Sequence, residues 1–187
     1  MLNVIIDSNI IIANYFLRYT AFSKFCKYFP ERLIQVYVTE VSVEEIFKNY
    51  KNNYREIYNG FNKVWKELKK VSVNEIESKN IELEEDAVEK YKDYLYNLFR
   101  ENKIKILPFP KVEHKEIVKY SITGKKPFKQ KDTGYKDFLI WHSALDILKE
   151  SQRQLVIITK DSDFLDDGKV CDDFLDFLKE KLFKVQN

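Results

Sequence analysis

Short apolar runs alternate with longer amphipathic segments along this chain. The runs at Val4–Ile6, Ile34–Val38, Ile104–Leu107 and Leu155–Thr159 predict buried β-strands, because strands covered on both faces are apolar almost throughout. Between these runs, apolar residues recur every three or four positions, which is the spacing of one face of an α-helix. Strands that alternate with helices favour a parallel sheet with helices on both sides.

The segments between the runs define the expected helices. The first is expected to begin after the turn at residues 7–9 and to continue to about residue 29. Ser42 and Glu45 have the spacing of a capping box, so a second helix is expected to begin at Ser42 and to reach Lys48 or beyond. Further helices are expected over residues 57–68, 81–100, 112–120, 137–148 and 172–183.

These elements predict a three-layer α/β/α fold of the Rossmann-like type. Its central sheet is expected to be mainly parallel, with four to five strands, and a helical insertion is expected at about residues 50–103. The length of 187 residues suits one domain, so residues 1–187 are expected to form a single unit. A hydrophobic content of 44% excludes a disordered chain.

Charge and cysteine content narrow the range of functions. The net charge of +2 excludes a general attraction to polyanions, so a nucleic acid must be met by a local patch. No apolar run approaches the ~18 residues of a membrane span, and the amino-terminal residues do not have the pattern of a signal peptide. Cys26 and Cys171 lack metal-binding spacing and are expected to be reduced thiols in the core of a cytoplasmic protein.

Acidic residues follow the predicted strands. Asp7 comes directly after the first strand, and Glu44 and Glu45 lie near the start of the helix after the second. Asp161 and Asp163 follow the fourth strand. Because the carboxyl ends of parallel strands share one edge, where open α/β sheets bind ligands, we expect these acids to lie close together.

Each acid also has a purely structural explanation. Asp7 suits a helix cap, Asp161 suits a turn, and Glu45 suits the capping box. Asp137, which opens the helix before the fourth strand, suits the positive end of the helix dipole. A cluster of carboxylates nevertheless repels itself unless a cation neutralises it. Oxygen ligands without a histidine or cysteine set select Mg²⁺ or Mn²⁺, cations that suit phosphate chemistry.

This ordered set of acids resembles that of the PIN-domain nucleases. In that family an Asp-Ser/Thr-Asn turn ends the first strand, and a Glu lies near the start of the second helix. A third acid opens the helix before the fourth strand, and an acidic or amide position follows a Thr after that strand. The corresponding segments here are Asp7-Ser8-Asn9, Val43-Glu44-Glu45-Ile46, Asp137 and Thr159-Lys160-Asp161-Ser162-Asp163. Gly134-Tyr135-Lys136-Asp137 and the following Ile140-Trp141 resemble one subgroup of PIN-like proteins. The resemblance covers the chain in order, although the insertion matches only loosely.

The resemblance implies a metal-dependent endonuclease that hydrolyses phosphodiester bonds, with RNA favoured over DNA. Carried over by position, the catalytic and metal-binding residues would be Asp7, Glu45, Asp137 and Asp161, with Asp163 as a further metal ligand that competes with Asp161. The cofactor would be one or two Mg²⁺ or Mn²⁺ ions. Glu45 is preferred to Glu44 because it directly precedes the apolar Ile46. Asn9 and Thr159 would orient the acids through hydrogen bonds.

The resemblance leaves the biological role and the partners open. A toxin of a toxin–antitoxin pair, an anti-phage defence effector and an RNA-processing enzyme are all compatible with it. A homodimer is common in the family, and a toxin would bind an antitoxin or another regulatory protein.

Residues 123–134 form a basic loop before Asp137. Lys126, Lys129, Lys131 and Tyr135 are expected to contact a nucleic acid, by gripping the backbone and stacking on a base. The alternative is a solvated lysine-rich loop.

The helix after this loop carries His142 and Trp141. His142 lies five residues after Asp137, which is ~140° around a helix, so it does not share the face of the acid and is expected to have a structural or surface role. Trp141 is expected to lie in the core, because other apolar residues share its stripe.

Three other protein classes compete with an active nuclease. A PIN-like module without catalysis would bind RNA or a protein. A phosphoacceptor receiver domain would have an adjacent acidic pair after the first strand, where this chain has Asp7-Ser8-Asn9. A haloacid-dehalogenase-like phosphatase would have Asp-x-Asp there, but residue 9 is Asn9.

Overall fold

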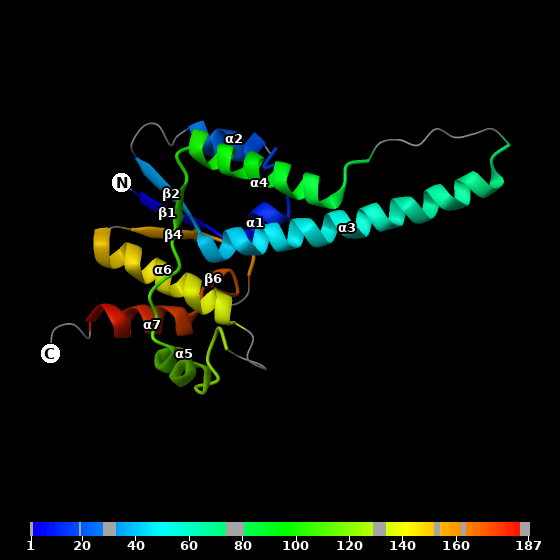
Figure 1. Ribbon diagram of the computed structural model, residues 1–187. Helices are drawn as coiled ribbons and strands as arrows, with labels where there is room; N and C mark the ends of the chain where they lie inside the picture. The colour runs from blue at the N-terminus through cyan, green and yellow to red at the C-terminus, as the bar shows by residue number, and fades with distance from the viewer. Residues whose placement is uncertain are drawn as a thin grey trace.

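A sheet of four parallel strands lies between two layers of helices (Figure 1). The computed structural model describes residues 2–18, 20–27, 33–73, 81–128, 134–151, 154–161 and 164–183. The strands are β1 (Leu2–Ile6), β2 (Ile34–Thr39), β3 (Lys105–Leu107) and β4 (Leu155–Ile158), in the order β3-β2-β1-β4. All four lie where the apolar runs predict strands, and the three-layer fold is confirmed.

The helices fill both layers and the insertion. They are α1 (Ser8–Ile12), α2 (Thr20–Lys27), α3 (Glu40–Val71), α4 (Glu84–Glu101), α5 (His114–Ser121), α6 (Tyr135–Ser151) and α7 (Asp172–Phe183). An antiparallel hairpin of β5 (Leu165–Asp166) and β6 (Lys169–Val170) follows β4. The sequence did not predict this hairpin, because strands of two residues are too short for a periodic pattern.

The two faces of the sheet are covered by different helices. Val4 and Ile6 of β1 pack in one cluster with residues of α1, α3 and α4. Ile5, between them, packs in the other cluster with α5, α6 and α7. Trp141 of α6 is fully buried in this second cluster, as its stripe predicts. Cys171 is a buried free thiol in the same cluster.

Two helix predictions are wrong. The helix expected from the first turn to about residue 29 is divided into α1 and α2, because Leu17 has a positive φ of 48°, which cannot continue a right-handed helix. The capping box is also absent: α3 begins at Glu40, and the Thr39 side chain accepts the backbone N–H of Ser42 at 3.1 Å. Glu45 consequently lies inside the helix, and its carboxylate contacts other elements.

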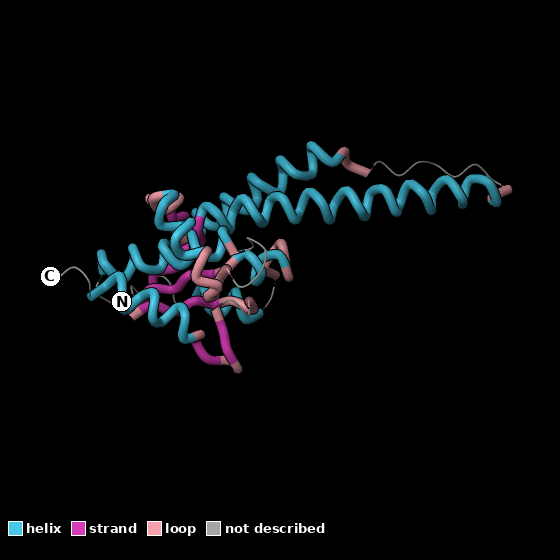
Figure 2. Tube along the Cα trace, turned by 90° about the horizontal axis from the view of Figure 1, so that it is seen from below, coloured by secondary structure: helices cyan, strands magenta, loops and turns pink. Residues whose placement is uncertain are grey.

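The insertion consists of the long second part of α3 and of α4. The helix expected near Ser42 and that expected over 57–68 are one helix of 32 residues, and α3 projects beyond the rest of the protein (Figures 1 and 2). α4 lies against the first half of α3, where the rings of Tyr50 and Tyr91 stack with centroids 3.9 Å apart. None of the helices in the described ranges combines the length and the hydrophobicity that a membrane span requires.

Candidate active site

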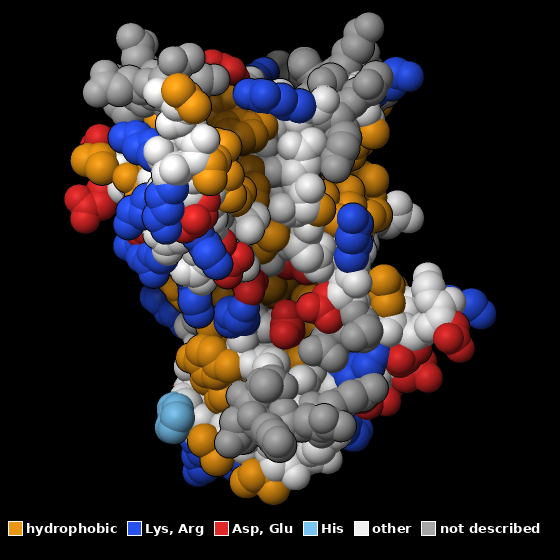
Figure 3. All heavy atoms as spheres, turned by 90° about the vertical axis from the view of Figure 1, so that its right-hand side faces the viewer, with side chains coloured by type: hydrophobic (Ala, Val, Ile, Leu, Met, Phe, Trp, Pro, Cys, Tyr) orange, Lys and Arg blue, Asp and Glu red, His pale blue; other side chains and the backbone are white. Residues whose placement is uncertain are grey.

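The carboxyl edge of the sheet brings residues from both ends of the chain together. β1 lies between β2 and β4, so the strand order reverses here, and open α/β sheets bind ligands at this position. Ile6 pairs with Ile158, and Asp7 and Thr159 are the residues that follow them. Figure 3 views the side on which the strands end and shows acidic side chains near the middle of this face, with lysines and arginines around them.

Asp7 is held at this edge by several hydrogen bonds, although only 3% of its surface is exposed. Its Oδ1 accepts the backbone N–H of Ser8 at 2.6 Å. Its Oδ2 accepts the Asn9 amide at 2.8 Å and the Thr159 hydroxyl at 2.7 Å. Asp7 is also the N-cap of α1, so it has both a structural contact and a position in the acidic cluster. Asn9 and Thr159 therefore contact the acid that they were expected to orient.

Burial raises the pKa of Asp7 above its ordinary value, because the ionised carboxylate loses hydration. The nearby carboxylate of Asp161 raises this pKa further, whereas hydrogen bonds from Thr159 and Ser8 lower it. The net shift is upward, so positive charge beside Asp7 would stabilise its ionised form. Carboxyl groups perturbed by burial and by a second carboxylate are typical of functional sites.

Ser8 connects Asp7 to Glu45. Ser8 Oγ lies 2.8 Å from Glu45 Oε2 and 3.3 Å from Asp7 Oδ1. The Ser8 hydroxyl carries one proton, and the shorter distance assigns that proton to Glu45 Oε2. Asp7 Oδ1 therefore keeps a lone pair that can bind a cation or accept another hydrogen bond. The second oxygen of Glu45 forms an ion pair with Lys136 Nζ. Glu44 is exposed on α3, whereas Glu45 is half-buried at this edge.

The turn after β4 is tied to the turn after β1. The Asp161 backbone N–H donates to Thr159 Oγ1 at 2.9 Å, and the Lys160 backbone N–H donates to Asn9 Oδ1 at 3.1 Å. These bonds keep Asp161 close enough to Asp7 for the two charges to interact. Asp163 lies outside the residues that the structure describes.

Asp137 lies in the first turn of α6, directly after Lys136. Because Lys136 pairs with Glu45, the start of α6 lies at the same edge of the sheet. Gly134, just before α6, has a φ of +95°, and a Cβ there would clash with the backbone oxygen of Pro127. The glycine of the segment 134–137 is therefore required by the path of the backbone into α6.

The donor chemistry of this edge fits a hard divalent cation, since Asp7, Glu45, Asp137 and Asp161 all supply carboxylate oxygens. Ser8 links the side chains of Asp7 and Glu45, and Thr159 links the Asp7 side chain to the backbone N–H of Asp161. Within the described ranges, no three His, Cys, Asp or Glu side chains converge closely enough to hold a metal ion. The Lys136 ammonium supplies positive charge at Glu45, so a divalent cation there would compete with it.

The basic loop is only partly available to a ligand. Lys126 is 3% exposed, and its Nζ donates to Leu165 O at 2.9 Å and pairs with Asp166 at 2.6 Å. The ammonium of Lys126 thus joins the loop to β5, a structural role in place of the expected contact with nucleic acid. Lys129 and Lys131 lie outside the described residues.

His142 lies in the helical layer beneath the sheet. Its ring is within 4.8 Å of the Phe138 ring and 5.0 Å of the Phe177 ring, measured between centroids. Burial lowers the pKa of His142 to about 4, although the Glu116 carboxylate, 3.5 Å from Nε2, opposes this shift. A neutral imidazole among aromatic rings fits the expected structural role.

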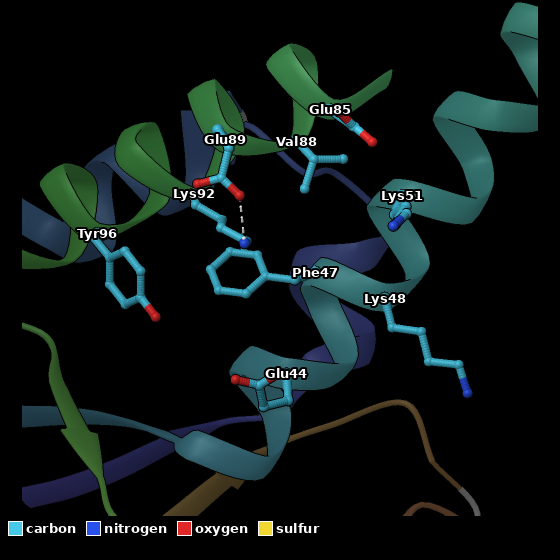
Figure 4. Close-up of a pocket in the computed structure, with 9 residues that line it drawn as sticks. All are labelled: Glu44, Phe47, Lys48, Lys51, Glu85, Val88, Glu89, Lys92 and Tyr96. Atoms are coloured by element: carbon cyan, nitrogen blue, oxygen red, sulfur yellow. Dashed lines mark hydrogen bonds and ion pairs between the residues drawn. The ribbon is translucent and has the colours of Figure 1, made fainter. Parts of the chain in front are cut away.

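Two pockets flank the first turns of α3. The first, of about 680 Å³, lies between α3 and α4 (Figure 4). It is lined by three lysines and three glutamates, and Lys51 and Lys92 pair with Glu84 at 3.8 Å and Glu89 at 2.7 Å. It therefore has no excess of positive charge for a polyanion. The second pocket, of about 650 Å³, includes Glu45 in its lining.

The fold is Rossmann-like, and acidic residues lie at its switch point. The chain matches the family model for the PIN domain over residues 4–164, so it belongs to the PIN-domain family, whose members are generally nucleases. No curated protein and no solved structure matched the chain.

Two residues of the site, Ser8 and Lys136, were not predicted from the sequence. Both lie inside segments that carry the family resemblance, next to Asp7 and Asp137 respectively. The sequence signal for each was its place next to a predicted acid: the Ser8 hydroxyl follows Asp7, and the Lys136 ammonium precedes Asp137.

Proposed function

We propose that this protein is an endonuclease that hydrolyses phosphodiester bonds in RNA with Mg²⁺ or Mn²⁺ as cofactor. The observation that carries the proposal is the link between Asp7, Glu45 and Asp161 at the switch point of the sheet, through Ser8 and Thr159. RNA is favoured over DNA because of the family resemblance. An antitoxin or another regulatory protein as partner, and a homodimer, belong to the same proposal.

In this proposal the acids bind the cofactor, and the neighbouring polar side chains orient the acids. Asp7, Glu45, Asp137 and Asp161 would hold the cofactor, whose positive charge attracts a phosphate group and lowers the pKa of a bound water. Asn9 and Thr159 keep the Asp7 carboxylate in one orientation, and Ser8 does the same for Glu45. Lys136 adds a positive charge to which a phosphate oxygen can bind.

A second candidate is a PIN-like module that binds RNA without cutting it. Two observations favour it: the described carboxylates do not converge as a metal site, and Lys136 already neutralises Glu45. The two candidates differ in one outcome, which is cleavage.

Cleavage of labelled RNA and of DNA of the same sequence, in Mn²⁺, Mg²⁺ or EDTA, distinguishes them. We expect the full-length protein to cut RNA in either metal and not in EDTA. Asp7→Asn and Asp137→Asn should each reduce the rate by about 100-fold or more, because a metal ligand is lost. Asp176→Asn, an exposed acid of α7, is the matched control and should retain the wild-type rate.

Thermal melting of each variant in EDTA checks that the fold is retained. We expect Asp137→Asn to melt at or above the wild-type temperature, because the substitution relieves repulsion among carboxylates. Binding of RNA by the wild-type protein without cleavage in any metal would favour the module and reject the nuclease.

A further inference from the structure

The pocket beside Glu45 has features that the acidic edge does not explain. It is lined by residues of α3, by Phe109 between β3 and α5, and by the first turn of α6. Two of its lining residues, Glu45 and Lys136, form the ion pair of the candidate active site. A ligand in this pocket would therefore touch the site at which a phosphodiester would be cut.

Two large aromatic rings are exposed in this pocket. Phe109 is 50% exposed and Tyr135 is 49% exposed, although such side chains are usually buried. They come from separate elements, and each lines the pocket. Aromatic faces of this kind stack on nucleobases, whatever the base, because every base has a π face.

The backbone around Phe109 is already fixed in the protein without a ligand. Phe109 lies between Pro108 and Pro110, whose rings fix their own backbone angles, and its N–H donates to Glu40 Oε2 at 3.2 Å. A side chain whose backbone is already fixed loses less entropy on binding. An exposed aromatic ring on a fixed segment has the properties of a binding surface.

Polar and charged groups complete the lining of the pocket. Asn49 donates to the Glu45 backbone oxygen at 2.9 Å, which fixes its amide plane, and Asn52 adds a second amide. Amides donate and accept hydrogen bonds, as base edges do. Lys48 also lines the pocket, and Figure 4 shows its side chain directed away from Phe47 and from α4. Lys48 and Lys136 are balanced in this lining by Glu44 and Glu45, so the rings and the amides, rather than net charge, would select the ligand.

We propose that this pocket binds one unpaired nucleobase of single-stranded RNA, next to the phosphodiester that is cut. The inference rests on the proposed function, and it specifies the substrate as single-stranded. A base in a duplex is already stacked and paired, so it would have to leave the helix to lie against Phe109 and Tyr135.

Fluorescence anisotropy in EDTA tests the pocket without cleavage. The probes are a labelled single-stranded RNA, a perfect hairpin duplex, and a series of the single strand with one abasic nucleotide moved along it. We expect the wild-type protein to bind the single strand more tightly than the hairpin. At one position, the abasic nucleotide should weaken binding by about 5- to 100-fold, the range of base–aromatic stacking.

Two variants connect this loss to the pocket. Phe109→Ala and Tyr135→Leu should each weaken binding of the intact strand, and neither should be sensitive to the abasic position. Tyr96→Leu is the matched control, because Tyr96 is 45% exposed and lines the other pocket. It should bind like the wild-type protein. Thermal melts of all three variants verify folding.

The outcomes separate this inference from the proposed function. If all abasic strands bind equally tightly, the pocket does not bind a base, even if the protein cleaves RNA. The same conclusion follows if Tyr96→Leu weakens RNA binding as much as Tyr135→Leu does. Tighter binding of the hairpin also overturns the inference. Failure to cleave in Mn²⁺ and Mg²⁺ rejects the nuclease, while the binding series in EDTA still decides whether the pocket takes a base.

Discussion

Thr159 occupies the centre of the hydrogen-bond network at the acidic edge. Its hydroxyl donates to Asp7 and accepts the N–H of Asp161, so one side chain orients two acids. We predict that Thr159→Val, which keeps the shape but removes the hydroxyl, lowers metal-dependent cleavage by about 10- to 100-fold. Steady-state rates on labelled RNA measure the loss.

Thr159→Ser is the matched control for this prediction, since it retains the hydroxyl. It should restore most of the rate that Thr159→Val loses. Equal rates for Thr159→Val and the wild-type protein would show that the network does not orient the acids for cleavage.

His142 makes the stability of the protein depend on pH. Its folded pKa of about 4 lies below its ordinary value of 6.5, so the unfolded chain takes up a proton at a higher pH than the folded one. The stability from neutral His142 is therefore complete above pH ~6.5 and is lost as pH falls toward ~4, by about 3 kcal/mol at most.

Urea unfolding of the wild-type protein and of His142→Gln between pH 7 and 4 tests this sign. The free energy of unfolding of the wild-type protein should fall more steeply than that of His142→Gln, because glutamine does not titrate. Parallel curves for the two proteins would contradict a buried neutral imidazole.

The contacts that define the site join residues far apart in sequence, and this limits what the sequence can predict. The positions of Asp7, Asp137 and Asp161 at element ends followed from the alternation of strands and helices, whereas Glu45 lies inside α3. The Ser8–Glu45 hydrogen bond and the Lys136–Glu45 ion pair depend on how α1, α3 and α6 pack against each other. Lys126 was misjudged for the same reason, because its burial depends on β5, a hairpin strand that the sequence did not predict.

α3 is supported by α4 only along its first half. Phe47, Tyr50 and Tyr54 lie toward α4. In the second half, four apolar side chains are exposed, namely Ile57, Val64, Leu68 and Val71. α4 begins at Glu84, which pairs with Arg55, so the covering helix ends near the middle of α3. A helix segment of about fifteen residues without packing is marginally stable in water.

We therefore predict that backbone amides of residues 60–71 exchange with solvent at least about 10-fold faster than those of residues 43–54. Hydrogen exchange measured by NMR or mass spectrometry resolves the two halves. Uniform protection along the whole of α3 would contradict the prediction.

Element types were easier to predict than element ends. The four strands and the final helix lie where the apolar pattern predicted them. The start of α3 was missed because Thr39 and Ser42 both have cap chemistry, and only the backbone geometry selects Thr39. The division between α1 and α2 was missed because the left-handed backbone at Leu17 has no sequence signal.

The chain as a whole combines the three-layer fold with the projecting second half of α3 and an acidic edge of the sheet. The parallel sheet places the turns after β1 and β4 side by side, and α3 and α6 each contribute one more acid or ammonium to that edge. The order β3-β2-β1-β4, which determines this arrangement, was not predicted from the sequence, which indicated only a mainly parallel sheet. The exact spacing of the carboxylates depends on side-chain packing.

Direct binding of Mn²⁺ to the full-length protein tests whether the acids from distant parts of the chain act together on one cation. Free Mn²⁺ is measured by electron paramagnetic resonance during a titration of the wild-type protein, Asp7→Asn, Glu45→Gln and the control Asp176→Asn. We predict saturable binding by the wild-type and control proteins, and at least about 10-fold weaker binding by Asp7→Asn and by Glu45→Gln. Binding that is equal in all four proteins, or absent from the wild-type protein at millimolar Mn²⁺, would contradict a cation site at this edge.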